Sequence, residues 1–295
     1  MRRPLPLGLA ALLAASLTLV ACGGEAGAIR TAPPDRFDAA RAFRDLRMQV
    51  ALGPRPAGSR ASRRLAETLR RQMPDARVES VPGGLRNVVG TLPGRGRPIL
   101  VGAHYDTKDI PGFVGANDGA SGVAVVLELS RALRAGRRAC EREIRFVMFD
   151  GEESPAGSPD ARFLQDGLRG SRAYAAAHAG ELGAAIVVDM VGDRDLSIPR
   201  EAGSDARMWR MLRRSAGRVG AGAAFPPRTA GRILDDHTPF AQRGVPAIDL
   251  IDFSYPPWHT RADRLDKVSA RSLELTGEPL ADMLQRLARQ TCQGG

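Results

Sequence analysis

Four short apolar runs, separated by segments of helical periodicity, limit most strongly what this chain can fold into. Each run has the length and aliphatic composition of a buried strand. The runs are residues 99–103, 144–149, 185–190 and 247–251. The helical segments between them are residues 122–133, 170–178, 205–219 and 235–242. Strands that alternate with helices predict a single α/β domain with a mixed, mostly parallel central sheet covered by helices on both faces.

The two ends of this domain add further elements. Ser59 is placed to cap the second of two amphipathic helices near the start of the domain, and Pro-Gly-Gly joins two short strands as a turn. The predicted helices are residues 37–52, 61–73 and 269–291, and the strand pair is 78–81 with 87–92. Residues 154–167 and 221–232 are rich in small residues, proline and glycine, so we expect loops there.

The N-terminal residues predict export rather than a part of the fold. Arg2 and Arg3 precede an apolar run that ends at Leu19-Val20-Ala21-Cys22, as in a secretory signal. This ending resembles the lipobox of bacterial lipoproteins, which implies a signal peptide over residues 1–21, lipidation of Cys22 and a location in the cell envelope, facing the periplasm or the cell surface. The alternative is an ordinary signal or a single membrane anchor. We expect residues 22–36 to be a flexible tether and residues 37–295 to form the folded domain.

The charge of the chain limits which partners it can bind, and its cysteines indicate whether it can form a disulfide. The formal charge is +10, and only Lys108 and Lys267 are lysines, so arginines scattered along the helices carry it. No aromatic side chains interleave with them, which argues against nucleic-acid binding and favours a basic coat that faces water or an anionic surface. Outside the cytoplasm Cys140 and Cys292 can form a disulfide, although the sequence alone does not show their geometry.

Acidic and histidine residues stand where the predicted strands end. His104 follows the first core strand, Asp150-Gly151-Glu152-Glu153 follows the second, and Asp189 ends the third. Asp118 precedes a helix, and His259 lies near the C-terminus. Ligands bind at the carboxyl edge of a parallel sheet, so we expect these side chains to meet there, although any one of them alone is also explained as a satisfied core or capping residue.

This combination of imidazole and carboxylate suits zinc, which takes such ligands and keeps one position open in catalytic sites. We expect Asp118, Glu153 and His259 to hold the ion and Glu152 to stay free beside it for acid–base work. His104 and Asp189 either bind a second metal bridged by Asp118 or form hydrogen bonds around the first. Asp106 is placed to orient His104.

Several longer stretches carry a family resemblance. HYDTK, GFVGANDGASGVAVVLELSRAL, FDGEE, DDHTPFAQRGVPAIDLI and WHTRAD together resemble the M28 zinc peptidases and glutaminyl cyclases. Tyr105, Lys108, the Asp235-Asp236-His237 run and Trp258 are most similar to glutaminyl-peptide cyclotransferases. The resemblance implies a zinc aminopeptidase-like fold and a zinc-dependent catalytic domain over residues 37–295.

In the cyclases that the chain resembles, residues matching Asp118, Glu153 and His259 hold one zinc, and the residue matching Glu152 shuttles the proton. Residues matching Asp189 and Asp235 hydrogen-bond around that acid, and Trp258 matches a wall of the substrate pocket. In the dizinc aminopeptidases, residues matching His104 and Asp189 bind the second metal. Two departures stand out: residues 154–160 lack the aromatic residue of animal cyclases, and Asp249 replaces a histidine.

These observations favour a glutaminyl-peptide cyclotransferase that converts N-terminal glutamine to pyroglutamate and releases ammonia, with one zinc ion. The first alternative is an M28 aminopeptidase with two zinc ions, and the second is a non-catalytic binding lipoprotein. The expected partners are peptide N-termini as substrate and a membrane through the lipid anchor, with the protein a monomer that binds no nucleic acid.

Overall fold

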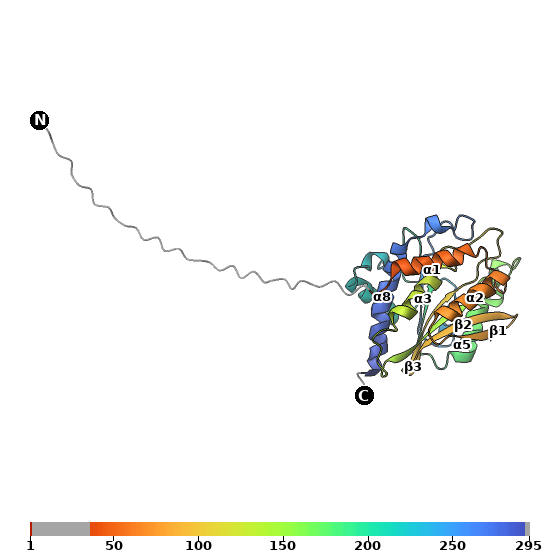
Figure 1. The fold of residues 1–295 in the computed structure, drawn as a ribbon, viewed down its shortest axis with the longest axis horizontal. Coiled ribbons are helices and arrows are strands. Elements are labelled where there is room, and N and C mark those ends of the chain that lie inside the picture. The colour runs from red at the N-terminus through yellow and green to blue at the C-terminus, as the bar shows by residue number, and fades with distance from the viewer. Residues whose placement is uncertain (2–35, 293–295) are drawn as a thin grey trace. The chain divides into compact units, whose positions relative to one another are not determined.

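A six-stranded sheet forms the centre of the protein, as the computed structural model shows (Figure 1). The structure describes Met1 and residues 36–292. The strands are β1 (Arg77–Val81), β2 (Leu85–Leu92), β3 (Arg95–His104), β4 (Arg142–Phe149), β5 (Ala184–Asp189) and β6 (Ala247–Ile251). The lipidation site expected at Cys22, the predicted signal peptide beyond Met1 and all but the last residue of the predicted tether lie outside the described residues.

The sheet is mixed, as the sequence predicts. Its strand order is β1-β2-β4-β3-β5-β6. β1, β2 and β4 pair antiparallel, whereas β4, β3, β5 and β6 run parallel to one another. The Pro82-Gly83-Gly84 turn joins β1 to β2, and both glycines adopt the positive φ that such a turn requires. The four parallel strands therefore place their carboxyl ends along one edge.

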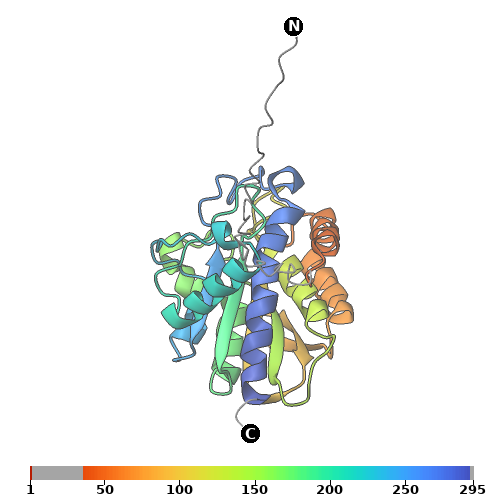
Figure 2. The same cartoon turned by 90° about the vertical axis from the view of Figure 1, so that its left-hand side faces the viewer.

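Helices cover both faces of the sheet (Figures 1 and 2). The longer ones are α1 (Ala39–Ala51), α2 (Arg60–Gln72), α3 (Ser121–Ala132), α5 (Arg169–His178), α6 (Ala206–Arg218) and α8 (Ala270–Arg289). The short ones are α4 (Phe163–Asp166) and α7 (Thr238–Ala241). Side-chain caps start several of them, because Ser59, Asp205 and Ser269 each accept a hydrogen bond from a backbone N–H in the first turn.

The core has two layers, one on each side of the sheet. Alternate residues of a strand point to opposite faces, so neighbouring valines of β2 separate: Val88 joins one cluster and Val89 the other. The larger cluster contains side chains from α1, α2, α3, α6 and α8, and the smaller one contains Tyr174 of α5 and Phe240 of α7. Both faces of the parallel strands are thus buried, which explains their unbroken apolar sequence.

The main differences from the sequence prediction lie in two segments. The loop expected over residues 154–167 contains a 3-10 turn (Asp160–Arg162) followed directly by α4. The helix expected from residue 235 begins at Thr238 instead. Asp235 and Thr238 close a turn before it, because the Asp235 carbonyl accepts from the Thr238 N–H at 2.8 Å and the Asp235 N–H donates to Thr238 Oγ1. That turn frees residues 235–237 to carry side chains to the functional site.

Cys140, just before β4, is bonded to Cys292 at the end of the last helix. The structure therefore contains the disulfide that the sequence leaves open. Within residues 36–292, none of the helices combines the length and the apolar character needed to cross a bilayer.

Candidate active site

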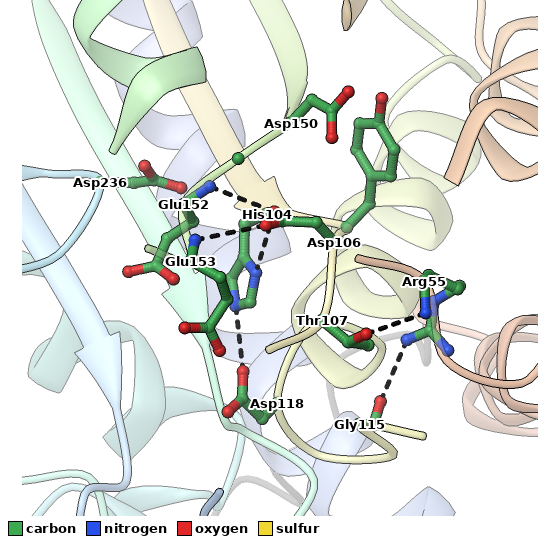
Figure 3. A network of polar contacts seen from close by, with 12 residues as sticks. Arg55, His104, Asp106, Thr107, Gly115, Asp118, Asp150, Glu152, Glu153 and Asp236 are labelled. Atoms are coloured by element: carbon green, nitrogen blue, oxygen red, sulfur yellow. Dashed lines mark hydrogen bonds and ion pairs between the residues drawn. The ribbon is translucent and has the colours of Figure 1, made fainter. Parts of the chain in front are cut away.

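The candidate site lies at the carboxyl ends of β4, β3 and β5, which are neighbours in the sheet. β3 ends at His104 and β5 ends at Asp189. Residues 150–153 continue directly from β4, and the loop after β3 brings Asp118 over the same edge (Figure 3). The parallel arrangement thus gathers the side chains that the sequence places after separate strands.

Asp118, Glu153 and His259 form a group in which each offers one donor atom, all within 4.8 Å of one another. His259 Nε2 lies 3.1 Å from Glu153 Oε1 and 3.4 Å from Asp118 Oδ2. The two carboxylates are buried, whereas the His259 imidazole is 25% exposed. The backbone of His259 has a φ of 53°, a conformation that is uncommon outside glycine and is typical of functional sites.

His104, Asp118 and Asp189 form a second group of the same kind. His104 Nε2 lies 3.2 Å from Asp189 Oδ1 and 3.4 Å from Asp118 Oδ1. All three side chains are buried. Asp118 therefore faces one imidazole with each of its oxygens, as a carboxylate that bridges two positions would.

Burial raises the pKa of Asp118 to about 7, and the negative charge of Glu153 adds to the effect. Burial also favours the neutral form of Glu153, but the hydrogen bond from His259 and the positive charges of His259 and Lys108 together outweigh it and lower the pKa of Glu153. Lys108 Nζ lies 3.1 Å from Glu153 Oε2 and stabilises the same charge. The buried carboxylates of Asp118 and Glu153 offer oxygens within 4.8 Å of each other. Two negative charges this close repel each other unless a cation lies between them, so the group is suited to bind a positive ion.

Glu152 is buried next to these residues, and its pKa is raised well above the ordinary value by burial and by the charge of Glu153. The sequence predicts that Asp106 orients His104, and Asp106 Oδ1 does lie 3.6 Å from His104 Nδ1. Both Asp106 oxygens also accept hydrogen bonds from the backbone N–H groups of Glu152 and Glu153, at 3.1 and 3.2 Å (Figure 3). Asp106 thus fixes the turn from which the two acids project.

Near Asp189 lies a cluster of charged side chains, of which the sequence singles out Asp235, His237 and Asp249 but gives Glu201 no role. Burial and the charge of Asp189 raise the pKa of Asp235 to about 6. His237 lies between two acids, 3.4 Å from Glu201 Oε2 and 3.6 Å from Asp249 Oδ2. The sequence comparison places Asp249 where animal cyclases carry histidine. Here the imidazole of His237 lies next to Asp249 instead. The place of Asp249 in the apolar strand β6 is a further signal that marks it.

A cavity of about 330 Å³ opens onto Glu152 and the first metal-binding group. Trp258 forms part of its wall, is 41% exposed and stacks on His259 with ring centroids 4.1 Å apart. Phe163 of α4 lines the same cavity. The aromatic residue missing from residues 154–160 is thus matched by one only a few positions later. The unpredicted helix α4 explains how Phe163 reaches the cavity.

Two supporting residues were assigned no role from the sequence. Asp263 accepts hydrogen bonds from the backbone N–H groups of Asn117 and Asp118, at 2.8 and 3.0 Å, and so fixes the loop that carries Asp118. The side chain of Arg55 is fully buried and donates to the carbonyls of Val114 and Gly115 in the same loop. Among residues 36–292, the guanidinium of Arg55 donates only to backbone carbonyls. Because no acidic side chain of those residues pairs with it, the sequence carries no signal from which this role could be predicted.

An α/β fold that gathers carboxylate–imidazole groups at the carboxyl edge of its central sheet is typical of a metal-dependent α/β enzyme. The chain belongs to peptidase family M28, whose profile matches residues 87–284. Its relatives include glutaminyl-peptide cyclotransferases and an aminopeptidase, so the chain is an enzyme of a zinc-dependent family, as the sequence predicts.

The similar proteins include both cyclases and peptidases. The glutaminyl-peptide cyclotransferase-like protein of Mus musculus is 31% identical over 60% of this chain, and the match covers 54% of that relative, so the chain spans about half its length. A solved glutaminyl cyclase of an Acidobacteriales bacterium is 32% identical, covers 88% of this chain and 97% of its own, and has a TM-score of 0.75. A leucine aminopeptidase precursor of Bacteroides thetaiotaomicron is 25% identical over 86% and 98%, with a TM-score of 0.74.

The residues present fit zinc. Each group joins one imidazole nitrogen to carboxylate oxygens, the donor types that zinc prefers. Asp118 Oδ2 is buried and accepts no hydrogen bond from residues 36–292, so an oxygen of the bridging carboxylate is available to a cation. The sequence-predicted ligands Asp118, Glu153 and His259 are thus brought together, and so are His104 and Asp189. Their roles as ligands stay predictions.

Proposed function

We propose that this enzyme is a glutaminyl-peptide cyclotransferase that converts the N-terminal glutamine of peptides to pyroglutamate and releases ammonia. The proposal is supported by similarity to glutaminyl cyclases along most of the chain and by the shape of the site. The observation that carries it is the position of Trp258, which stacks on His259 at the mouth of the cavity. A flat apolar wall next to the metal group suits a glutamine side chain folded back on its own amine.

In the reaction, the α-amino nitrogen of the substrate attacks the carbon of its own γ-carboxamide. One C–N bond forms, and the bond to the amide nitrogen breaks to release ammonia. Glu152 accepts the proton from the attacking amine and returns it to the leaving nitrogen. Its raised pKa suits a group that must both accept and donate a proton.

Asp189 and Asp235 act beside Glu152 rather than on the substrate carbon. Burial and the charge of Asp189 raise the pKa of Asp235 to about 6, so Asp235 can take up a proton in weakly acidic solution at the wall of the cavity that Glu152 also lines. Holding the amine and the carboxamide together reduces the entropy cost of ring closure, which in well-oriented systems contributes up to several kcal/mol. When bound by Asp118, Glu153 and His259, zinc would polarise the carboxamide carbonyl.

An aminopeptidase is the second candidate, and one observation favours it. Asp118 directs one oxygen toward His259 and the other toward His104, which is the arrangement expected for a carboxylate that bridges two metal ions. In that case Glu152 would take a proton from water, and His104 and Asp189 would hold the second ion.

The two candidates are separated by their products. We expect the purified enzyme to convert a peptide beginning with Gln to a product 17 Da lighter, the mass of the ammonia lost, and to leave a matched peptide beginning with Leu unchanged. Mass spectrometry measures both. Shortening of either peptide by its first residue would show a peptidase instead.

We also propose that the enzyme acts in the bacterial cell envelope as a lipoprotein anchored at Cys22. The signal-like residues 1–21 support this location. The bond between Cys140 and Cys292 also fits an oxidising compartment. Labelling with a radioactive or alkyne-bearing fatty acid, lost in Cys22→Ser, would test it.

A further inference from the structure

A second cavity of about 330 Å³ adjoins the active-site cavity. The two share wall residues, namely Arg232, Ile233, Ile251 and Phe253. Phe253 is 47% exposed, and its ring lies 4.7 Å from that of Trp258. A peptide whose N-terminal residue occupies the first cavity therefore has an adjoining hollow for the residues that follow, beside a pair of exposed aromatic rings.

Two arginines give this second cavity its charge. Arg228 and Arg232 both line it, and both are exposed. Neither makes an ion pair with any residue of the described part of the chain, and Arg228 donates one long hydrogen bond, at 3.5 Å, to Ser197 Oγ. Two guanidinium groups without acidic partners, at the side of a groove, are suited to bind carboxylates.

The acids of the same cavity lie deeper than its arginines and are held by the backbone. Asp252 accepts from the Ser197 N–H at 2.7 Å. Glu201 accepts from the N–H groups of Gly203 and Ile233, at 2.7 and 3.2 Å, and also faces His237. Both carboxylates are buried, whereas Arg228 and Arg232 are exposed, so the guanidinium groups are the charges that a ligand entering the cavity meets first.

The backbone that carries the arginines is held in place. Arg200 and Thr229 form a short parallel bridge. Within it, the Ala230 N–H donates to the Arg200 carbonyl at 2.8 Å, and the Arg200 N–H donates to the Arg228 carbonyl at 3.2 Å. The loop expected at residues 221–232 is therefore pinned next to the active site, and its arginines are presented from a fixed backbone.

We propose that this second cavity is a subsite for the second and third residues of the peptide substrate, and that Arg228 and Arg232 make it prefer aspartate or glutamate there. The inference rests on the proposed action at peptide N-termini. An extended peptide advances about 3.3 Å per residue, so the residues directly after the first one reach the adjoining hollow. An exposed ion pair typically contributes about a two- to fivefold change in binding.

The experiment compares kcat/KM for three peptides that differ only at positions two and three: Gln-Glu-Glu, Gln-Ala-Ala and Gln-Lys-Lys, each with the same amidated tail. We expect the wild-type enzyme to prefer the acidic over the basic peptide about fivefold or more at low salt. The preference should shrink in 0.5 M NaCl, since salt screens exposed charges (Debye length about 3–4 Å). Arg228→Gln/Arg232→Gln should bring the ratio to within about twofold of one.

The matched control is Arg210→Gln/Arg214→Gln on the outer face of α6, where both side chains are exposed and make no side-chain hydrogen bond or ion pair within residues 36–292. It removes the same charge and should keep the preference. Thermal melting would show that both double variants are folded. An unchanged ratio in Arg228→Gln/Arg232→Gln, or no preference in the wild type, would overturn the subsite.

Failure of the proposed reaction gives a different result. If the enzyme shortens these peptides rather than cyclising them, the cyclase is wrong, but the same charge ratio is measured on release of the first residue. If neither reaction occurs, calorimetric binding of the three peptides to the zinc-loaded protein still measures the preference. Equal binding of acidic and basic peptides would then contradict it.

Discussion

The two sides of Asp118 are built from the same residue types but differ in access. Toward the cavity, Glu153 and His259 form a group whose imidazole is 25% exposed. On the other side, His104 and Asp189 form a group in which the imidazole is 2% exposed and lies at hydrogen-bond distance from Asp189, which also lines the cavity. Both residues that face Asp118 on the first side line the cavity, whereas on the second side only Asp189 does and the His104 imidazole is buried.

This difference shows why similar sequences can serve two reactions. Cyclisation within one substrate needs a polarised carbonyl and a proton carrier, so one ion on the open side is sufficient. Peptide hydrolysis by the two-metal route also needs the buried side to hold an ion. Whether His104 and Asp189 bind each other or a metal therefore decides between the two candidates, and the ligand residues alone do not.

The largest expected effect comes from removing one imidazole on each side. His259→Ala should lose zinc and reduce turnover to background, because the open group then keeps only two ligands. His104→Ala should keep about one zinc per chain and lose only about 10–100-fold in activity, as for residues that orient a metal site. Metal analysis together with kcat measures both.

Equal zinc loss and equal loss of turnover in the two variants would contradict the one-ion cyclase and favour the two-metal peptidase. His178→Ala is the control. That imidazole lies on α5 and contacts Glu79 and Glu181, so the substitution should leave both the zinc content and the activity unchanged.

Glu152→Gln sharpens the comparison by removing the proton carrier without touching either metal group. Turnover should fall by about 10²–10⁴-fold, the usual contribution of a general acid–base residue, while zinc content stays at the wild-type level. Glu67→Gln, on the exposed face of α2, controls for the loss of one acid. Wild-type turnover in Glu152→Gln would remove Glu152 from the mechanism under either reaction.

The sequence predicts the fold well because burial on both faces gives the parallel strands a strong signal. The core strands 144–149 and 247–251 end at the same residues in the structure as in the prediction. The prediction is less accurate where a turn or a capping side chain sets the start of a helix, as at Thr238. It also misses α4, because four residues are too few to show a helical period. Local turn chemistry, rather than periodicity, sets both.

The site is predictable where chemistry-bearing residues directly follow strands, as at His104 and Asp189. It is less predictable where a contact depends on two distant segments. The contact of His237 with Asp249, and the support of the Asp118 loop by Asp263, link residues that no spacing rule connects. Phe163 shows the same limit, since only the position of α4 shows that it lines the cavity.

The smallest expected effect concerns pH and tests whether Asp118 needs a cation. Without metal its pKa is about 7, against 3.8 for an ordinary aspartate. Between these values the folded protein holds a proton that the unfolded chain releases, so the stability of the metal-free protein falls as pH rises from about 4 to about 7. Zinc binds the ionised carboxylate and opposes this loss.

The difference in Tm between zinc-loaded and chelator-treated protein should therefore widen from pH 5 to pH 7.5, as scanning calorimetry can measure. In Asp118→Asn the difference should be small and flat, and a gap that does not change with pH in the wild type would mean that zinc is held without Asp118.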